Sequence, residues 1–196
     1  MHVATLCGSL HSGSTNAVVL ATITDRLGAG GAAIEAVDVS VDVPALRPEQ
    51  MEEPPAAVRA VRAVFERADG VVFAVPEYAG GLPGWVKNIT DWMVSSASLY
   101  ERPAAVVSAA TAGGAHAIAQ LARTLTWQGA YVVATHSIAA PLTMVRDGTI
   151  TDPDAAAGLD RVADVLAAVM RGDVDPADAA AEALTPLGID PHDRLS

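Results

Sequence analysis

The chain is poor in cysteine, in basic residues and in aromatic side chains. Cys7 is its one cysteine, so a disulfide within the chain is excluded and a cysteine-ligated metal cluster lacks ligands. Only 12 Lys and Arg stand against 23 Asp and Glu, which leaves a net charge of −11 at pH 7. Such a field repels the phosphates of nucleic acids and anionic membrane surfaces, so we expect neither as a partner. With 3 Trp, 3 Tyr and 2 Phe, small-residue packing of helices on a sheet is favoured over an aromatic-rich β-sandwich.

Long apolar runs and targeting signals are also missing. No apolar run approaches the roughly 18 residues of a membrane span without a Gly, Pro or polar break, and the N-terminus lacks the layout of a signal peptide. We therefore expect a cytoplasmic protein. Its 196 residues, 51% of them hydrophobic, predict one globular domain. We place this domain at residues 1–172 and interpret residues 173–196 as an acidic extension, whose "RGDVDPADAAAEAL" segment is typical of a solvated surface.

Five short apolar runs alternate with helical patterns along the chain. The runs cover residues 3–7, 32–40, 70–78, 103–111 and 130–140. Between them, apolar residues recur three and four apart, as in Val58, Val61 and Phe65, with Arg62 expected to face water. Continuous rather than alternating apolar strands indicate a parallel sheet covered on both faces. In such a doubly wound α/β domain, ligands bind at the loops that follow the carboxyl ends of the strands.

Loop 1 (residues 8–16) follows the first strand and reads "GSLHSGSTN". It ends at a predicted helix N-terminus, where free N–H groups and the helix dipole favour an anion. The side chains that add donors there are Ser9, His11, Ser12, Ser14, Thr15 and Asn16. A simple helix cap by Ser14 or Thr15 accounts for one hydroxyl, whereas a phosphate site accounts for all of them. The loop is neither a Walker loop nor a dinucleotide fingerprint, because the Gly-Lys-Ser/Thr and the three spaced glycines are missing.

Loop 2 (residues 76–83) and loop 3 (residues 108–114) follow the third and fourth strands. Loop 2 brackets two glycines with prolines, which suits either a rigid turn or a ligand contact. In loop 3, Gly113 and Gly114 permit close approach of a flat ligand, although an ordinary strand-to-helix turn has the same composition. Lys87 and Asp91 lie four apart and are expected to pair on a helix surface.

Other chemically active residues carry weaker signals. Trp85 and Trp92 are either core residues or, on an exposed helix face, anchors of a subunit contact. The histidines show no metal spacing, and we predict no metal site. Ser108, Thr111 and His116 form no nucleophilic triad pattern. Cys7 ends an apolar strand and is interpreted as an inert core thiol.

Taken together, the three loops resemble the NADPH-dependent FMN reductase family, which includes quinone, chromate and azo-dye reductases. In that family loop 1 reads Gly-Ser-Leu-Arg, two residues, Ser, one residue, Asn; loop 2 reads Pro-Glu-Tyr-Asn, a short gap, Pro, then Leu-Lys-Asn and Asp-Trp. The matching residues here are Gly8, Ser9, Leu10, Ser14, Asn16, Pro76, Glu77, Tyr78, Pro83, Lys87, Asn88, Asp91, Trp92 and the loop 3 pair Gly113 and Gly114. The resemblance spans residues 3 to about 140, and the spacing in loop 2 is its most specific part.

The resemblance implies a flavodoxin-like, three-layer fold with a five-stranded parallel sheet in the order 2-1-3-4-5. It implies an FMN-dependent NAD(P)H oxidoreductase that works by ping-pong hydride transfer through the flavin N5 to a quinone or similar small acceptor, with no catalytic side chain. A homodimer or homotetramer is expected, with flavin sites near the subunit interface. The expected FMN-binding residues are Ser9, His11, Ser14, Thr15 and Asn16 at the phosphate, and Pro76, Glu77, Tyr78, Ala79, Gly113 and Gly114 around the ring.

The chain departs from the family pattern at two positions that bear on flavin binding. His11 stands where the family has Arg, and Ala79 stands where it has Asn. Arg offers phosphate a permanent charge and a forked donor, whereas a neutral His offers one N–H. These departures support an alternative function, a non-enzymatic electron carrier or a binding module that has lost flavin.

Overall fold

The computed structural model describes residues 1–11, 13–39, 42–139, 143–146 and 148–193. Its strands are β1 (His2–Cys7), β2 (Ala33–Ala36), β3 (Gly70–Ala74), β4 (Pro103–Ala110), β5 (Tyr131–Ala139), β6 (Val145–Arg146) and β7 (Thr149–Ile150). Its α-helices are α1 (Thr15–Ala29), α2 (Ala56–Glu66), α3 (Gly84–Met93), α4 (Ala115–Trp127), α5 (Pro153–Arg171) and α6 (Pro176–Leu184). Single turns of 3-10 helix lie at Pro48–Gln50, Val94–Ser96 and Thr185–Leu187.

The five longest strands form one parallel sheet in the order β2-β1-β3-β4-β5, which confirms the predicted order. All five residues of β3 and the first seven of β4 are buried, which is why these strands read as continuous apolar runs. The second strand is shorter than the predicted run of residues 32–40, whose last residue lies outside the described ones. β2 is an edge strand with three of its four residues exposed, so little burial supports further pairing.

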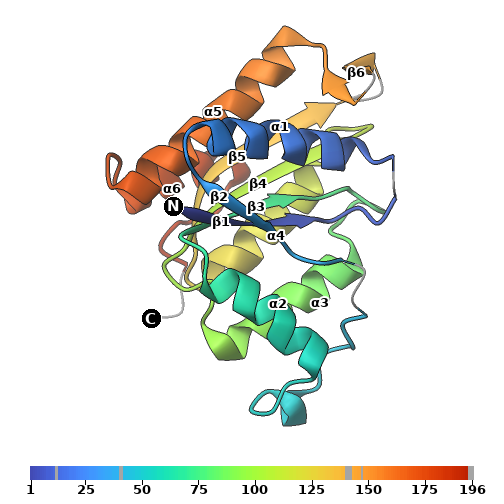
Figure 1. Ribbon diagram of the computed structural model, residues 1–196, viewed down its shortest axis with the longest axis vertical. Helices are drawn as coiled ribbons and strands as arrows, with labels where there is room; N and C mark the ends of the chain where they lie inside the picture. Colours follow the sequence, from blue (N-terminus) through green and yellow to red (C-terminus); the bar gives the residue numbers. More distant parts are fainter. Residues whose placement is uncertain (12, 40–41, 140–142, 147, 194–196) are drawn as a thin grey trace.

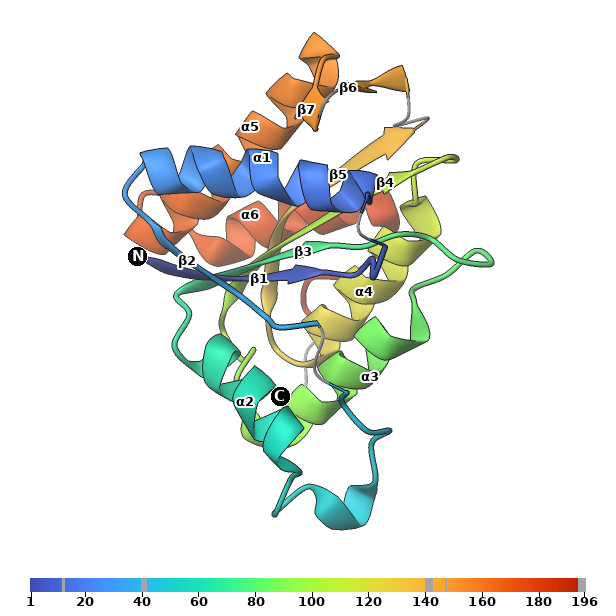
Figure 2. The same ribbon diagram turned by 45° about the vertical axis from the view of Figure 1, so that its right-hand side comes forward.

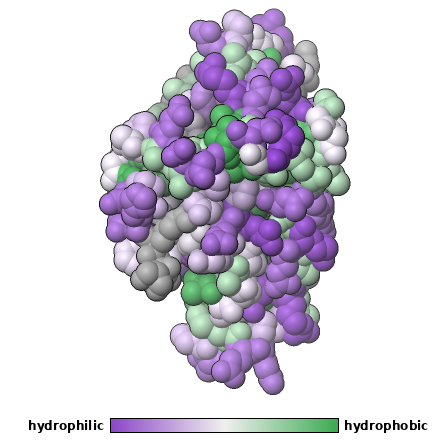
Figure 3. Space-filling view, turned by 90° about the vertical axis from the view of Figure 1, so that its left-hand side faces the viewer, coloured by the Kyte–Doolittle hydropathy of each residue, from purple (hydrophilic) through white to green (hydrophobic). Residues whose placement is uncertain are grey.

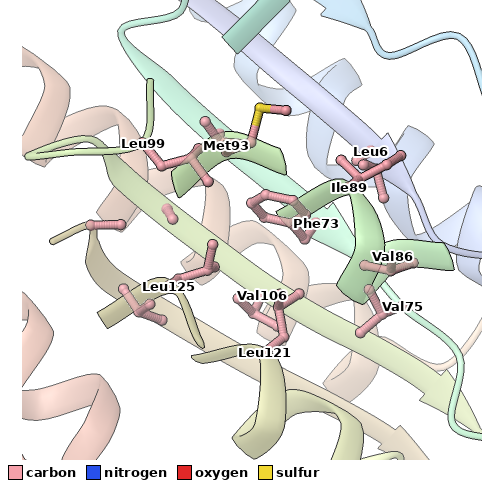
Figure 4. Packing of buried hydrophobic residues seen from close by; sticks show 14 of the residues in the cluster. Leu6, Phe73, Val75, Val86, Ile89, Met93, Leu99, Val106, Leu121 and Leu125 are labelled. Carbon is pink, nitrogen blue, oxygen red and sulfur yellow. The ribbon is translucent and has the colours of Figure 1, made fainter. Parts of the chain in front are cut away.

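Helices cover both faces of the sheet, as the predicted three-layer architecture requires. In Figure 1, α1 and α5 lie on one side of the strands, and α2 and α3 lie on the other. Side chains of β3 alternate between two cores: Val71 and Phe73 pack toward α2, α3 and α4, while Val72 and Ala74 pack toward α1 and α5. Figure 4 shows the first of these cores, in which Phe73 and Val106 of the sheet lie among side chains from α3 and α4.

The C-terminal segment is more ordered than its acidic composition indicates. We expected "RGDVDPADAAAEAL" to be a solvated surface, and this is wrong for three of its residues, because Ala179, Ala180 and Leu184 of α6 are buried. Ala179 belongs to one core and the other two belong to the opposite one, so α6 straddles the edge strand β5 against which it packs. A helix over an edge strand blocks pairing with other chains. The boundary at residue 172 stays a prediction.

Arg62, which was expected at the surface, and Trp92, which was expected either in the core or at a subunit contact, are both buried. Arg62 is 8% exposed and donates from Nε and Nη2 to the Trp92 carbonyl, at 3.2 and 2.6 Å. The cation thereby caps the C-terminal end of α3, where carbonyls lack helical partners, and burial lowers the pKa of its guanidinium. Trp92 is 0% exposed and donates its indole N–H to the Pro44 carbonyl at 2.8 Å. It is therefore a core residue, and the interpretation of Trp92 as a subunit anchor is wrong.

The outer surface is mainly hydrophilic on the side where the two chain ends lie. Figure 3 shows this face, on which hydrophobic residues form only small separate patches. Among the described residues, no helix combines the length and the apolar character that crossing a bilayer requires. The cytoplasmic location stays a prediction.

Candidate flavin site

Loops 1, 2 and 3 meet at the carboxyl edge of the sheet. In Figure 2 the segments that follow β1, β3 and β4 leave the sheet on its right-hand side. Loops 1 and 2 also pack tightly, because a Cβ built on Gly8 would lie 3.1 Å from Cδ of the buried Pro76. The sequence therefore predicted correctly that these segments share one edge of the molecule.

Two of the expected phosphate ligands in loop 1 hold the loop itself. Ser14 is the N-cap of α1, and its Oγ accepts from the Asn16 N–H at 3.2 Å. The Asn16 carboxamide donates to the Ala109 carbonyl and accepts from the Ala109 N–H, both at 2.9 Å. Asn16 is 2% exposed, so its side chain ties loop 1 to β4 rather than facing solvent.

The other loop 1 residues leave donors for an anion. His11 Nδ1 accepts from the Gly13 N–H at 3.1 Å, so the neutral ring carries its proton on Nε2. Ser9 Oγ accepts from the His11 N–H at 3.4 Å and keeps its own hydroxyl proton for donation. Thr15 opens α1, whose first turn carries no acidic residue even though the chain is strongly acidic. Ser12 lies outside the described residues.

Loop 2 turns back on itself as a tight hairpin. Tyr78 and Gly81 exchange two backbone hydrogen bonds of 3.0 Å, and the two residues between them have positive φ, 50° at Ala79 and 72° at Gly80. Positive φ at both central residues defines a type I′ turn, for which Asn-Gly is the preferred pair. The family's Asn at this position is thus the residue that the turn favours, and Ala79 carries backbone strain in its place. Tyr78 is 57% exposed at the tip.

Glu77 joins loop 2 to the helix that follows loop 3. Its Oε2 accepts from the backbone N–H groups of His116 and Ala117, at 2.9 and 3.2 Å. These are among the first N–H groups of α4, which have no helical partner, and the N-cap residue Gly114 has no side chain to satisfy them. The structure therefore places the Glu77 carboxylate as a helix cap supplied from a distant loop.

Loop 3 is shaped by two consecutive left-handed glycines backed by two serines. Gly113 and Gly114 have φ of 91° and 76°. Ser137 of β5 donates its hydroxyl to the Gly113 carbonyl at 2.6 Å, and Ser108 of β4 is fully buried beneath Gly114. Ser137 was not among the residues expected at the site. The feature that could have indicated it is a hydroxyl near the carboxyl end of the fifth apolar run. Pairing of the fourth and fifth strands places this hydroxyl beside Ser108.

A groove of about 690 Å³ opens beside loop 2, between α3 and α4. The predicted Lys87–Asp91 ion pair is confirmed and lies on its α3 wall. The α4 wall carries Arg123 and Trp127, and Trp127 is 49% exposed. The groove begins at Gly80 and His116, so it is continuous with the loops of the candidate site.

The thiol of Cys7 lies at the carboxyl end of β1, beside loop 1. It is half-buried rather than a full core residue, and its Sγ–H points to the Ser9 carbonyl at 3.7 Å. Burial raises the pKa of this thiol, which favours its protonated form, and its inertness stays a prediction. Within the described part of the chain, no group of three His, Cys, Asp or Glu side chains is arranged to hold a metal.

Comparisons with known proteins agree with this geometry. The model of the NADPH-dependent FMN reductase family matches residues 1–143. Curated relatives include the quinone reductase of Escherichia coli K12, 35% identical over 95 residues (47% of this chain, 50% of the relative), and an NAD(P)H:quinone oxidoreductase of Solanum tuberosum, 38% identical over 112 residues (55% and 57%). The chain thus spans about half the length of the curated relatives it matches.

Solved structures show the same fold over most of the chain. The flavoenzyme NAD(P)H:(acceptor) oxidoreductase of Paracoccus denitrificans superposes with a TM-score of 0.72 and 26% identity, covering 87% of this chain and 97% of that one. A flavodoxin-type, WrbA-like protein of Agrobacterium tumefaciens gives 0.56 at 16% identity over 87% of this chain and 98% of that one, a likeness of fold alone.

Proposed function

The chain belongs to the NADPH-dependent FMN reductase family, and from this premise we propose that it binds FMN and uses NAD(P)H to reduce a small acceptor such as a quinone. The observation that carries the proposal is the joining of the three loops into one surface. Asn16 ties loop 1 to β4, and Glu77 ties loop 2 to α4. Hydroxyl and imidazole donors lie in loop 1 of this surface, and a glycine-lined turn lies in loop 3.

The residues present fit FMN by the chemistry of their donors. A phosphate needs N–H and O–H donors without nearby carboxylates. Ser9 and His11 of loop 1 and Thr15 at the start of α1 supply such donors, and the first turn of α1 carries no acid. A flat ring needs backbone approach without a Cβ, which Gly113 and Gly114 provide. Ser14, Asn16, Pro76 and Glu77 act in this proposal by holding the loops in place, with Tyr78 and Ala79 at the rim.

Bound FMN supplies the hydride-transfer chemistry, and the protein contributes position and electrostatics. The loop 1 donors would hold the phosphate, and the loops after β3 and β4 would orient the ring. Ping-pong kinetics are expected because NAD(P)H and the acceptor would react with the same flavin in turn. Initial rates at several fixed acceptor concentrations should give parallel double-reciprocal lines, and intersecting lines would contradict this part of the proposal.

We further propose a homo-oligomer that forms across the α3–α4 groove. Trp127 and Val94 are each 49% exposed there, and these two apolar side chains would be covered by the same surface of a second copy. The groove borders loop 2, which places a second copy close to the flavin. Sedimentation equilibrium should show a dimer or tetramer, and Trp127→Glu should shift it toward the 20 kDa monomer. A monomeric wild type at micromolar concentration contradicts this proposal.

The flavin-free binding module remains the second candidate, favoured by His11 and Ala79. The purified protein should be yellow, or should keep the yellow colour of added FMN after unbound FMN is removed by gel filtration, and should oxidise NADPH when a quinone is present. A protein that is colourless after this removal supports the module. A yellow protein that is slow with NADPH supports an electron carrier.

A further inference from the structure

Ser108 carries a buried hydroxyl without a hydrogen-bond partner. The residue lies near the carboxyl end of β4 and is 0% exposed. In the described part of the chain, two buried side-chain oxygen or nitrogen atoms have no hydrogen-bond partner, and Ser108 Oγ is one of them. The other, Gln128 Oε1, lies away from the loops, toward the far end of the α3–α4 groove. A buried hydroxyl without a partner disfavours the folded state, so each such group calls for a physical reason.

The neighbouring serine provides a direct comparison. Ser137 lies opposite Ser108 in the register of β4 and β5, and its hydroxyl donates to the Gly113 carbonyl at 2.6 Å. Two serines side by side on adjacent strands thus back the same turn. One of them is bonded to the turn, and the other is in contact with it but unbonded.

The turn that both serines support admits no side chain. A Cβ built on Gly113 would lie 2.7 Å from Ser137 Oγ, and one built on Gly114 would overlap Ser108 Oγ. Both glycines also have left-handed backbones, which other residues adopt only with strain. The Ser108 hydroxyl therefore lies directly under the Gly114 backbone, within reach of a small change in the turn.

We propose that Ser108 is a positioning residue for the flavin, whose hydroxyl gains its hydrogen bond from the Gly113–Gly114 backbone when the turn closes on the bound ring. The assignment rests on the proposed function. Because Ser108 is fully buried beneath Gly114, it acts on the ring through this turn and not by direct contact. Ser137 holds the turn in the flavin-free protein, and Ser108 adds a second bond in the flavin complex.

The test compares Ser108→Ala with Ser137→Ala in two measurements: the melting temperature of the flavin-free protein, and FMN affinity from quenching of flavin fluorescence. Without flavin, Ser108→Ala should melt at or above the wild-type temperature, because it removes an unsatisfied group, whereas Ser137→Ala should melt lower. With flavin, Ser108→Ala should weaken FMN binding about tenfold, the factor that one ordinary hydrogen bond represents. Riboflavin binding should weaken by the same factor, because the turn contacts the ring and not the phosphate.

Each outcome decides the assignment. FMN binding by Ser108→Ala within about twofold of wild type overturns it and leaves Ser108 as a packing residue. A flavin-free Ser108→Ala protein as destabilised as Ser137→Ala also overturns it, because the hydroxyl is then already bonded. If the alanine variant fails to fold, Ser108→Cys, with its weak S–H donor, should show an intermediate loss, and unchanged affinity overturns the assignment. A wild type that binds no flavin is a different result, which removes the proposed function itself.

Discussion

Asn16 and Ala109 bind each other through two hydrogen bonds across 93 residues of sequence. The Asn16 carboxamide pairs with both the N–H and the C=O of Ala109, at 2.9 Å each. The register of β3 on β4 ends at Ala74 opposite Val107, so Asn16 supplies the partner that a longer β3 would have supplied. Loop 1 is thereby attached to the central sheet before any ligand binds.

Replacing Asn16 with Ala should destabilise the flavin-free protein by about 2–3 kcal/mol, because it leaves a buried N–H and a buried C=O unpaired. Urea denaturation without flavin measures the change. Thr15→Ala is the matched control, because the Thr15 hydroxyl reaches the same carbonyl only at 3.5 Å. This substitution should lower the free energy of unfolding much less. Unchanged stability with weaker FMN binding would instead mean that Asn16 serves the phosphate.

Replacing Ala79 with Asn should stabilise the protein by roughly 0.5–1 kcal/mol. The residue has φ of 50° at the first central position of a type I′ turn, where Asn is tolerated and Ala is strained. Thermal unfolding measures the gain. Gly80→Ala, at φ of 72°, should do the reverse and lower the melting temperature. A destabilised Ala79→Asn protein would show that the turn is not type I′ in solution.

Replacing His11 with Arg should tighten FMN binding by about 1–2 kcal/mol, because a permanent charge and a forked donor then face the phosphate. Riboflavin, which has no phosphate, should gain almost nothing. Leu10→Arg, which adds the same charge at an adjacent residue that is 62% exposed, controls for the general electrostatic effect. Fluorescence titration of both flavins against the three proteins decides the matter. Equal gains for FMN and riboflavin would remove position 11 from the phosphate site.

Acid should destabilise the protein partly through His136. Burial, and less strongly the nearby Arg161 cation, lower the pKa of His136 below its ordinary value of 6.5. The unfolded chain therefore takes up this proton at a higher pH than the folded chain does. The stabilising contribution is complete above pH 6.5 and is lost as the pH falls from there toward the lower, folded-state pKa.

Chemical denaturation at about pH 7.5 and about pH 5.5, on wild type and on His136→Gln, isolates this contribution. The free energy of unfolding of the wild type should fall more over this interval than that of the variant, since the other titrating groups are common to both. Equal falls in the two proteins would show that His136 has the same pKa folded and unfolded.

The sequence by itself determined the layers, the positions of the loops and one local ion pair. Burial on both faces makes the central strands continuously apolar, and helical spacing marks the stripes that cover them, so both features are visible in a few adjacent residues. The local pairing of Lys87 with Asp91, one helical turn away, was equally visible in the sequence. The order of the strands followed from the family resemblance.

Tertiary structure alone decided which polar side chains serve the fold and which are left for a ligand. Asn16 and Glu77 belong to the family's motif, yet their partners lie 93 and 39 residues away, so their spacing in the sequence gives no sign that they bind backbone. Arg62 has the spacing of the buried stripe of α2, one turn after Val58, and only its charge indicated exposure. The end of α3 crosses above it, and the Trp92 carbonyl accepts from its guanidinium, so the charge is buried. The spacing of apolar residues predicts which face of a helix or strand is buried, because that spacing is visible within the element itself. Which residues pack against that face depends on how distant segments cross, and this is decided only when the whole chain folds.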